Sequence, residues 1–325
     1  MPSLKLVFAG SPSAAVPSLL ALVASQHEVV AVVTREDSPQ GRRGVLTPTP
    51  VAVAAEAHGI PVIKANKLAG AATDQIVALG ADLGVIVAYG GLVREPLLSS
   101  PAHGWINLHF SLLPRWRGAA PVQRAIIAGD EITGAAVFQL VAELDAGDVF
   151  GVLERPIESN ETAGQLLESL SDSGAALLTR VVDSIADGSA VAQVQVGDVT
   201  LAPKLALADG DIDWAQPAEL VSSQIRGVTP EPGAFTTVDG GRLKILEARI
   251  APDLAELTPG DVAPEQLAPG HIAQKGKLIL IGTATQPVQL LMVHPAGRKA
   301  MDAGSWWRGR AADSSSIASF TGANR

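Results

Sequence analysis

GWINLHF (residues 104–110) is a short apolar run that carries an asparagine and a histidine two positions apart, and the turn-forming segment SLLPRWRG (111–118) follows it. On a β-strand, residues two apart face the same side, so Asn107 and His109 are expected to project together. They stand near the end of the run, and open α/β sheets bind ligands at the carboxyl ends of their parallel strands. The stretch therefore predicts a strand with a polar site at its end.

Similar runs flank this strand on both sides along the chain. We expect strands over residues 4–10, 28–34, 61–65, 83–90, 104–110, 134–141 and 148–157. Segments such as AAVPSLLALVASQ (14–26) and ATDQIVALGA (72–81) lie between them, with apolar residues near a 3.6-residue period, and a longer helix is expected over 162–188. Strands that alternate with helices predict an α/β fold with a parallel-rich sheet covered on both faces.

The pattern changes near residue 190. Residues 190–209 show little periodicity and are interpreted as a linker, and a helix is expected after it over PAELVSSQIRGV (217–228). Short strands joined by glycine-containing turns come next, which is typical of a small β-barrel. We therefore expect a first domain over 1–189, a second over 210–310, and a flexible polar tail over 311–325.

Composition excludes several classes of protein. The chain has 325 residues and no cysteine, so disulfides, thiolate nucleophiles and cysteine-bound zinc are ruled out. No run of 18 apolar residues is present, so we expect no membrane span and a cytoplasmic location. We also expect a monomer. The net charge of −9 does not indicate a nucleic-acid binder, although residues 210–325 are much less acidic than the rest.

A carboxylate joins Asn107 and His109 as a candidate for chemistry. Asp145 lies in the turn LDAGD between two expected strands, where an aspartate is usually only a turn-forming residue. Together with the other two it would orient the imidazole, which acts as a base or stabilises an oxyanion. The dinucleotide, P-loop and nucleophile-elbow motifs are missing, and the histidines have no metal-ligand spacing, so we expect no metal.

Two basic stretches are candidates for contacts with phosphate. The long segment TREDSPQGRRGVLTPTP (34–50) carries Arg42 and Arg43 at its tip, and HPAGRKAM (294–301) carries Arg298 and Lys299. The alternative for both is a solvated surface, and for the first also a mobile loop.

FAGSP, VAYG, INLHFSLLPRWRGAAPVQRAI, LDAGD, IDW and HPAGRKAM occur here in this order. These motifs resemble the methionyl-tRNA formyltransferases over nearly the whole chain. The resemblance implies a Rossmann-like formyltransferase domain, a linker and a C-terminal OB-like barrel. It also implies an enzyme that transfers a formyl group from 10-formyltetrahydrofolate to the α-amino group of methionine on initiator tRNA.

The resemblance assigns roles to individual residues. Asn107, His109 and Asp145 match the catalytic trio, and Arg42 with Arg43 matches the loop that embraces the tRNA acceptor stem. The folate pocket maps onto Ala88, Tyr89, Gly90, Ser111, Leu112, Leu113, Pro114, Val141 and Leu144. Arg115 and Arg117 suit either tRNA phosphates or the folate glutamate tail. Phe110 departs from the small residue usual in the family and is expected to reshape the pocket.

Two other functions compete with this one. The same trio would serve another folate-dependent formyltransferase, or a formyl-folate hydrolase, that acts on a small acceptor or on water. A non-catalytic RNA-binding protein derived from such an enzyme is the second alternative. The 34–50 segment and the C-terminal β domain argue for tRNA as the acceptor, because a small acceptor needs neither, and the intact trio argues for catalysis.

Overall fold

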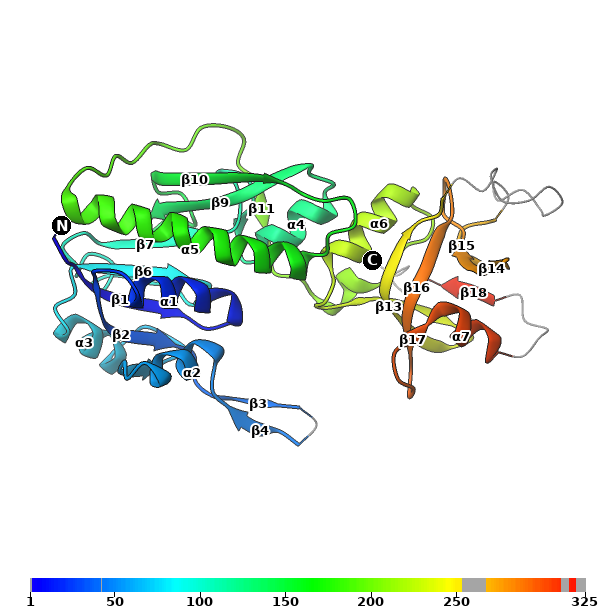
Figure 1. Ribbon diagram of the computed structural model, residues 1–325, viewed down its shortest axis with the longest axis horizontal. Coiled ribbons are helices and arrows are strands. Elements are labelled where there is room, and N and C mark those ends of the chain that lie inside the picture. Colours follow the sequence, from blue (N-terminus) through cyan, green and yellow to red (C-terminus); the bar gives the residue numbers. More distant parts are fainter. Residues whose placement is uncertain (1, 42, 253–266, 311–315, 320–325) are drawn as a thin grey trace. The chain divides into compact units, whose positions relative to one another are not determined.

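The computed structural model describes the chain except for residues 1, 42, 253–266, 311–315 and 320–325 (Figure 1). Two compact units make up the described part. The first comprises residues 1–121, 132–156 and 167–203, and the second comprises 122–131, 157–166 and 204–325. Each unit has a seven-stranded sheet, one parallel-rich and one antiparallel, which confirms the predicted fold class.

The sheet of the first unit has the strand order β10-β9-β7-β6-β1-β2-β5. Its strands are β1 (Lys5–Gly10), β2 (Glu28–Thr34), β5 (Val62–Lys64), β6 (Leu83–Val87), β7 (Trp105–His109), β9 (Ile132–Gln139) and β10 (Val149–Pro156). The strands from β5 to β7 run parallel, whereas β9 and β10 are added antiparallel to their neighbours. All the strands expected in this half of the chain are present.

The helix packed on one face of β7 determines which of its side chains point away from the helix layer. The first unit contains α1 (Val16–Val23), α2 (Pro50–Ala57), α3 (Ala71–Ala78) and most of α5 (Ala163–Asp187). Helix α5 lies tightly on β7, since a Cβ added at Gly174 would stand 3.0 Å from the side chain of Leu108. Because side chains alternate along a strand, Asn107 and His109 face away from α5.

The 34–50 segment is more ordered than the expected loop. Strands β3 (Ser38–Gln40) and β4 (Val45–Thr47) form an exposed antiparallel hairpin, which projects from the rest of the first unit in Figure 1. Arg43 is exposed at its tip, and Arg42 lies outside the described residues. The glycines at 41 and 44, both with positive φ, allow this turn.

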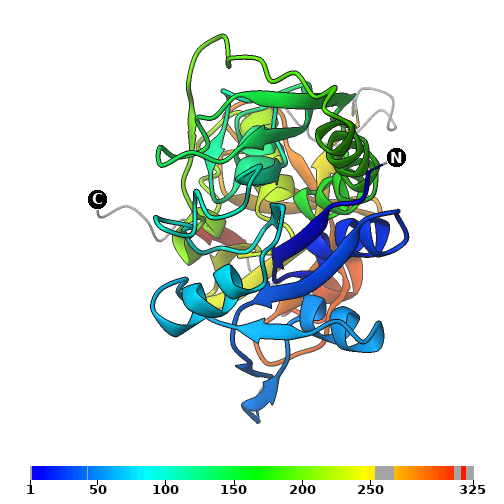
Figure 2. The ribbon, with the colours of Figure 1, turned by 90° about the vertical axis from the view of Figure 1, so that its left-hand side faces the viewer.

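Residues 190–203, here called the strap, lie in the interval expected to be a linker and pack on the first unit. The strap passes along β10 (Figures 1 and 2), where Gln193 forms a β-bridge with Val149. Its strand β11 (Leu201–Ala202) then pairs with β8 (Arg117–Gly118). Backbone pairing holds the strap, and apolar periodicity does not reveal such pairing. The domain boundary at 189 stays a prediction about independent folding.

The second unit contains an antiparallel barrel. Its strands are β12 (Ala234–Val238), β13 (Gly241–Ile250), β14 (His271–Lys275), β15 (Leu278–Ile281), β16 (Val288–Pro295), β17 (Met301–Asp302) and β18 (Ser316–Ser319). The pairing of β13 with β16 closes the ring that runs through β12, β18, β14 and β15. Three helices also belong to this unit: α4 (Pro121–Ile127, from Val122 onward), α6 (Ala218–Gly227) and α7 (Ala303–Arg308).

Local chemistry explains parts of the barrel. The β12–β13 hairpin turns on Asp239 and Gly240, whose φ values of 50° and 74° are those that a two-residue turn of this kind requires. Strand β18 lies inside the segment expected as a flexible tail, and it pairs with β12 and β14. The small, polar residues of this segment did not predict a strand, and the structure shows one.

No helix of the described residues is both long and apolar enough to cross a membrane.

We predict that Gly84→Ala destabilises the first unit by about 1–3 kcal/mol, the usual effect of overpacking. A Cβ at this position in β6 would stand 2.1 Å from the ring of Trp105, which is fully buried and donates its indole N–H to the Leu97 carbonyl oxygen. Urea unfolding measures the change. Gly241→Ala is the matched control, because its Cβ would meet no atom closer than 3.6 Å. Equal midpoints for the two variants would contradict the prediction.

Candidate active site

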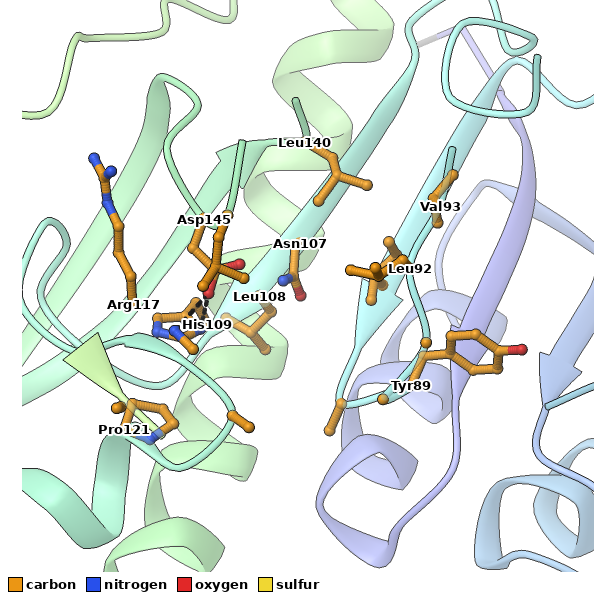
Figure 3. Close-up of a pocket in the computed structure, with 18 of the residues that line it drawn as sticks. Tyr89, Leu92, Val93, Asn107, Leu108, His109, Arg117, Pro121, Leu140 and Asp145 are labelled. Atoms are coloured by element: carbon orange, nitrogen blue, oxygen red, sulfur yellow. Dashed lines mark hydrogen bonds and ion pairs between the residues drawn. The ribbon is translucent and has the colours of Figure 1, made fainter. Parts of the chain in front are cut away.

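A pocket of about 700 Å³ lies at the carboxyl ends of β6 and β7, within the first unit (Figure 3). Asn107 and His109 reach it from β7, and Asp145 reaches it from the loop between β9 and β10. The structure therefore brings together the three residues that the sequence marks as candidates for chemistry.

His109 is held in one neutral form. Its Nε2 lies 2.8 Å from the carbonyl oxygen of Trp116, and because a carbonyl only accepts, Nε2 carries the hydrogen. Nδ1 therefore has the lone pair, and it stands 3.9 Å from Oδ2 of Asp145. Burial lowers the pKa of His109 below its ordinary value of 6.5, against the opposing effects of the carboxylate and of the Trp116 hydrogen bond. The neutral ring presents a basic nitrogen beside a carboxylate.

Asp145 is fixed by contacts with two other segments. Its Oδ2 accepts a hydrogen bond of 2.7 Å from the backbone N–H of Gly118, and its carbonyl oxygen accepts one of 2.8 Å from Nε2 of Gln195. The residue is only 8% exposed. These contacts orient one carboxylate oxygen toward the imidazole.

Asn107 offers an amide to the pocket. Figure 3 shows its side chain on the same strand face as His109. Among the described residues no protein group forms a hydrogen bond with this amide, and the side chain is half-buried. A donor in such a position is available to an oxygen atom of a bound molecule.

Strained backbone gathers around the pocket. Ala88, Trp116 and Asp145 have φ values of 48°, 63° and 46°, and only one other non-glycine residue of the described chain has positive φ. Such conformations persist where the surroundings enforce them, and they cluster at functional sites. For Trp116 the conformation accompanies a direct role, since its carbonyl oxygen binds His109.

The pocket includes some of the expected folate residues and leaves others out. Ala88, Tyr89, Gly90, Val141 and Leu144 line it. Ser111–Pro114 do not line it. The Ser111 hydroxyl is fully buried and donates to the Arg115 carbonyl oxygen, which closes that turn on itself.

Several lining residues were not expected from the sequence. They include Leu92, Val93, Leu140, Ala119, Pro121 and Leu201. Phe110, which was expected to reshape the pocket, and Arg117, whose role was left open between tRNA and the folate tail, also line it. The bulky Phe110 is 6% exposed and forms part of the wall. Leu201 comes from the strap, which had been interpreted as linker, so no motif connected it with the strand ends.

The two loop arginines differ in their surroundings. Arg117 lines the pocket, and its Nε and Nη2 donate to Oε1 of Gln195 at 3.1 and 2.7 Å. Arg115 does not line it, and its guanidinium lies 5.5 Å from the centre of the Trp116 ring. Arg117 is thus the cation of this pair that borders the candidate site.

Three of the expected tRNA contacts are not among the residues that line the pocket. Arg43 is exposed on the hairpin tip, and Arg298 and Lys299 are exposed on a turn of the second unit. Their roles stay predictions. Within the described ranges, no three histidine, aspartate or glutamate side chains gather as metal ligands would.

Comparison with known proteins identifies the family. The formyl transferase family matches residues 4–182, and the formyl transferase C-terminal domain matches residues 204–311. Methionyl-tRNA formyltransferase of Clavibacter michiganensis subsp. michiganensis is 60% identical over 306 residues, which are 94% of this chain and 97% of the relative. That of Leifsonia xyli subsp. xyli is 56% identical over the same shares.

Solved structures share the fold at lower identity. An N-formyltransferase from Helicobacter canadensis, in complex with folinic acid and dTDP-3-aminofucose, is 16% identical with a TM-score of 0.65 over 88% of this chain and 98% of its own. HypX from Aquifex aeolicus, in complex with tetrahydrofolic acid, is 16% identical with a TM-score of 0.58 over 93% of this chain and 46% of its own. Sequence matches that span almost the whole length decide the assignment: the chain belongs to the formyl transferase family and, within it, to the methionyl-tRNA formyltransferases.

Proposed function

We propose that this protein transfers the formyl group of 10-formyltetrahydrofolate to the α-amino group of methionine on initiator tRNA, and that the reaction takes place beside Asn107, His109 and Asp145. As a member of its family the protein is a one-carbon transferase. The observation that carries the assignment of the site is the neutral His109, whose Nδ1 stands 3.9 Å from the Asp145 carboxylate inside the pocket.

The pocket suits a flat, partly apolar donor. Its volume of about 700 Å³ lies within the usual range for small-molecule sites. Apolar walls come from Leu92, Val93, Phe110 and Leu140, while the polar groups gather at one end, around His109. The folates in the two solved relatives support a folate-derived donor here. Arg117 at the border fits an anionic part of the donor or of tRNA.

His109 is the proposed acceptor of the proton that the amine must lose. As the amine nitrogen bonds to the formyl carbon, its N–H becomes acidic and Nδ1 takes the proton. The bond between the formyl carbon and the folate nitrogen then breaks, and the proton held on Nδ1 goes to that nitrogen, which returns His109 to its neutral form. This sequence leaves formylmethionyl-tRNA and tetrahydrofolate and needs neither a metal nor a covalent enzyme intermediate.

Asn107 and Asp145 stabilise the charges that develop. The carbonyl oxygen of the formyl group becomes an oxyanion during the attack, and the free amide of Asn107 donates a hydrogen bond to it. Once Nδ1 is protonated, the imidazolium faces the Asp145 carboxylate at hydrogen-bonding range after a small movement. Together these groups favour the tetrahedral species over the reactants.

Recognition of tRNA is assigned to surfaces outside the pocket. Four residues are proposed to contact phosphates: Arg43 on the hairpin, Arg42 beside it in the sequence, and Arg298 and Lys299 in the second unit. The cytoplasmic location, the monomeric state and the absence of a required metal stay predictions.

One experiment tests the proposal. The protein is mixed with 10-formyltetrahydrofolate and methionyl initiator tRNA, and formylmethionine is measured after the ester is cleaved. Rapid formylation is expected with tRNA, and none with free methionine or with deacylated tRNA. Release of formate alone would support the hydrolase alternative, and formylation of a small amine in preference to tRNA would support another transferase.

We predict that His109→Ala lowers kcat by at least about 10²-fold, the low end of the contribution of a positioned acid–base group. The circular dichroism spectrum should stay that of the parent, because the side chain lies at a strand end beside a cavity. His58→Ala, on the exposed end of α2, is the matched histidine control. Normal turnover of His109→Ala would remove this residue from the mechanism.

We predict that kcat/KM falls with decreasing pH through an acid limb that lies below pH 6.5. The active form is the neutral ring, and burial lowers the pKa of His109, so its neutral form persists below the ordinary value of 6.5. The Asp145 carboxylate raises this pKa. Asp145→Asn should therefore lower the rate and move the limb to still lower pH. A limb that moves upward in this variant would contradict the arrangement.

We predict that Arg43→Ala weakens the use of tRNA and leaves the KM for the folate donor unchanged. Loss of one phosphate contact should make the dependence of tRNA affinity on salt shallower by about one unit of slope. Arg180→Ala, on the exposed side of α5, controls for the general loss of positive charge. The same salt slope in parent and Arg43→Ala would show that the arginine is only solvated. Arg42→Ala should behave like Arg43→Ala.

A further inference from the structure

The side chain of Gln195 joins two loops that together hold the candidate catalytic groups. We propose that Gln195 is a positioning residue of the reaction, which acts through Asp145 and the segment from Trp116 to Gly118. This inference rests on the proposed function, and it adds to that function a residue from the strap. Gln195 touches none of the reacting groups directly in the contacts described, so its effect is on geometry.

The first loop is the one that carries Asp145. Nε2 of Gln195 donates to the carbonyl oxygens of Asp145 and Gly147, both at 2.8 Å. Asp145 has a φ of 46°, a conformation that a non-glycine residue keeps only when its surroundings enforce it. The two bonds hold the turn at the strained residue itself and two residues after it. They therefore fix the direction in which the carboxylate leaves the backbone.

The second loop is the one that carries Arg117. Oε1 of Gln195 accepts from Nε and Nη2 of Arg117, at 3.1 and 2.7 Å. The backbone N–H of Gly118, the next residue, donates to the carboxylate of Asp145. The residue before, Trp116, accepts the hydrogen bond that fixes the ring of His109. One amide group thus uses both of its donors and its acceptor to hold the supports of two candidate catalytic side chains.

The rest of the strap strengthens the same connection. Thr200 accepts the backbone N–H of Trp116 on its Oγ1 at 2.9 Å, and its carbonyl oxygen accepts the backbone N–H of Arg117 at 2.9 Å. Both the side chain and the backbone of Thr200 therefore bind the backbone of the Trp116–Gly118 segment. Loss of Gln195 would leave the backbone pairing in place and would free the Asp145 turn, so the expected defect is local.

The strap offers a matched control. Gln193 is two residues before Gln195 and forms a backbone β-bridge with Val149, while its side chain is exposed and takes part in no hydrogen bond described for this segment. Truncation of Gln193 removes the same atoms from the same strap without touching either loop. A difference between the two variants therefore reports on the contacts of the Gln195 amide.

The experiment compares Gln195→Ala, Gln195→Glu and Gln193→Ala in the full-length protein, with steady-state formylation of methionyl-tRNA and with thermal unfolding. We expect Gln195→Ala to lower kcat by roughly 10- to 100-fold, the effect of a small misplacement of a catalytic group. The KM values for tRNA and donor should change less than about twofold. Gln195→Glu keeps an acceptor for Arg117 and loses the donors to the carbonyl oxygens, so its kcat should fall as well. Gln193→Ala should match the parent.

A double-mutant cycle separates positioning from general stabilisation. If Gln195 acts through Asp145, then Gln195→Ala should cause a much smaller further loss of kcat in an Asp145→Asn background than in the parent. If the double variant instead loses kcat by the product of the two single losses, the inference is overturned. It is also overturned if folded Gln195→Ala has the same kcat as Gln193→Ala. Should Gln195→Ala not fold, the isosteric Gln195→Glu decides by the same two criteria. Failure of the parent itself to formylate methionyl-tRNA would instead count against the proposed function.

Discussion

One hydrogen bond, from Nε2 of His109 to the carbonyl oxygen of Trp116, determines what the pocket is able to do. It assigns the hydrogen of the neutral ring to Nε2, and so it leaves a lone pair on Nδ1. Without it the ring would be free to place its hydrogen on Nδ1 next to Asp145, and Nδ1 would then have no lone pair to offer. The bond depends in turn on the left-handed conformation of Trp116, whose φ is 63°. The base that we propose for this site is thus prepared by backbone geometry as much as by a side chain.

The path of the loop that follows β9 explains why these groups meet. Parallel strands β6 and β7 end at the same edge, but β9 is antiparallel to β7, so its last residue, Gln139, pairs with Ile106 near the start of β7 and the loop begins there. That loop carries Asp145. Phe138 of β9 pairs with Asn107 and lies edge-on to the ring of His109, with 6.3 Å between the ring centres. The loop therefore runs back from the start of β7 to bring the carboxylate to the imidazole, and its bond with the Gly118 N–H holds it there.

The sequence predicted the elements well, because strand and helix periodicities are local properties. The seven strands of the first unit's main sheet, the long helix and the polar face of β7 all follow from patterns within a few residues of one another. The strap did not follow, since it is held by Gln195, Thr200 and backbone pairing, and these leave no apolar period. Strand β18 was not predicted either, because it too is held by backbone pairing with its neighbours. The position of Ser111–Pro114 outside the pocket is set by a turn that closes through a buried hydroxyl, which the resemblance of motifs does not encode.

The distance between the base and the carboxylate has a meaning of its own. Nδ1 of the neutral ring and Oδ2 of Asp145 are both acceptors, and they face each other at 3.9 Å with no hydrogen to share. In this state the facing lone pairs give no stabilisation. Burial lowers the pKa of His109, against the opposing effect of the carboxylate. When a proton arrives on Nδ1, the same pair becomes an imidazolium and a carboxylate in a poorly solvated place, where their attraction is strong. In the proposed reaction this gain appears only after proton transfer begins, so it would lower the barrier without tightening the binding of the reactants. A carboxylate that already formed a hydrogen bond with the resting ring would have spent that stabilisation before the reaction started.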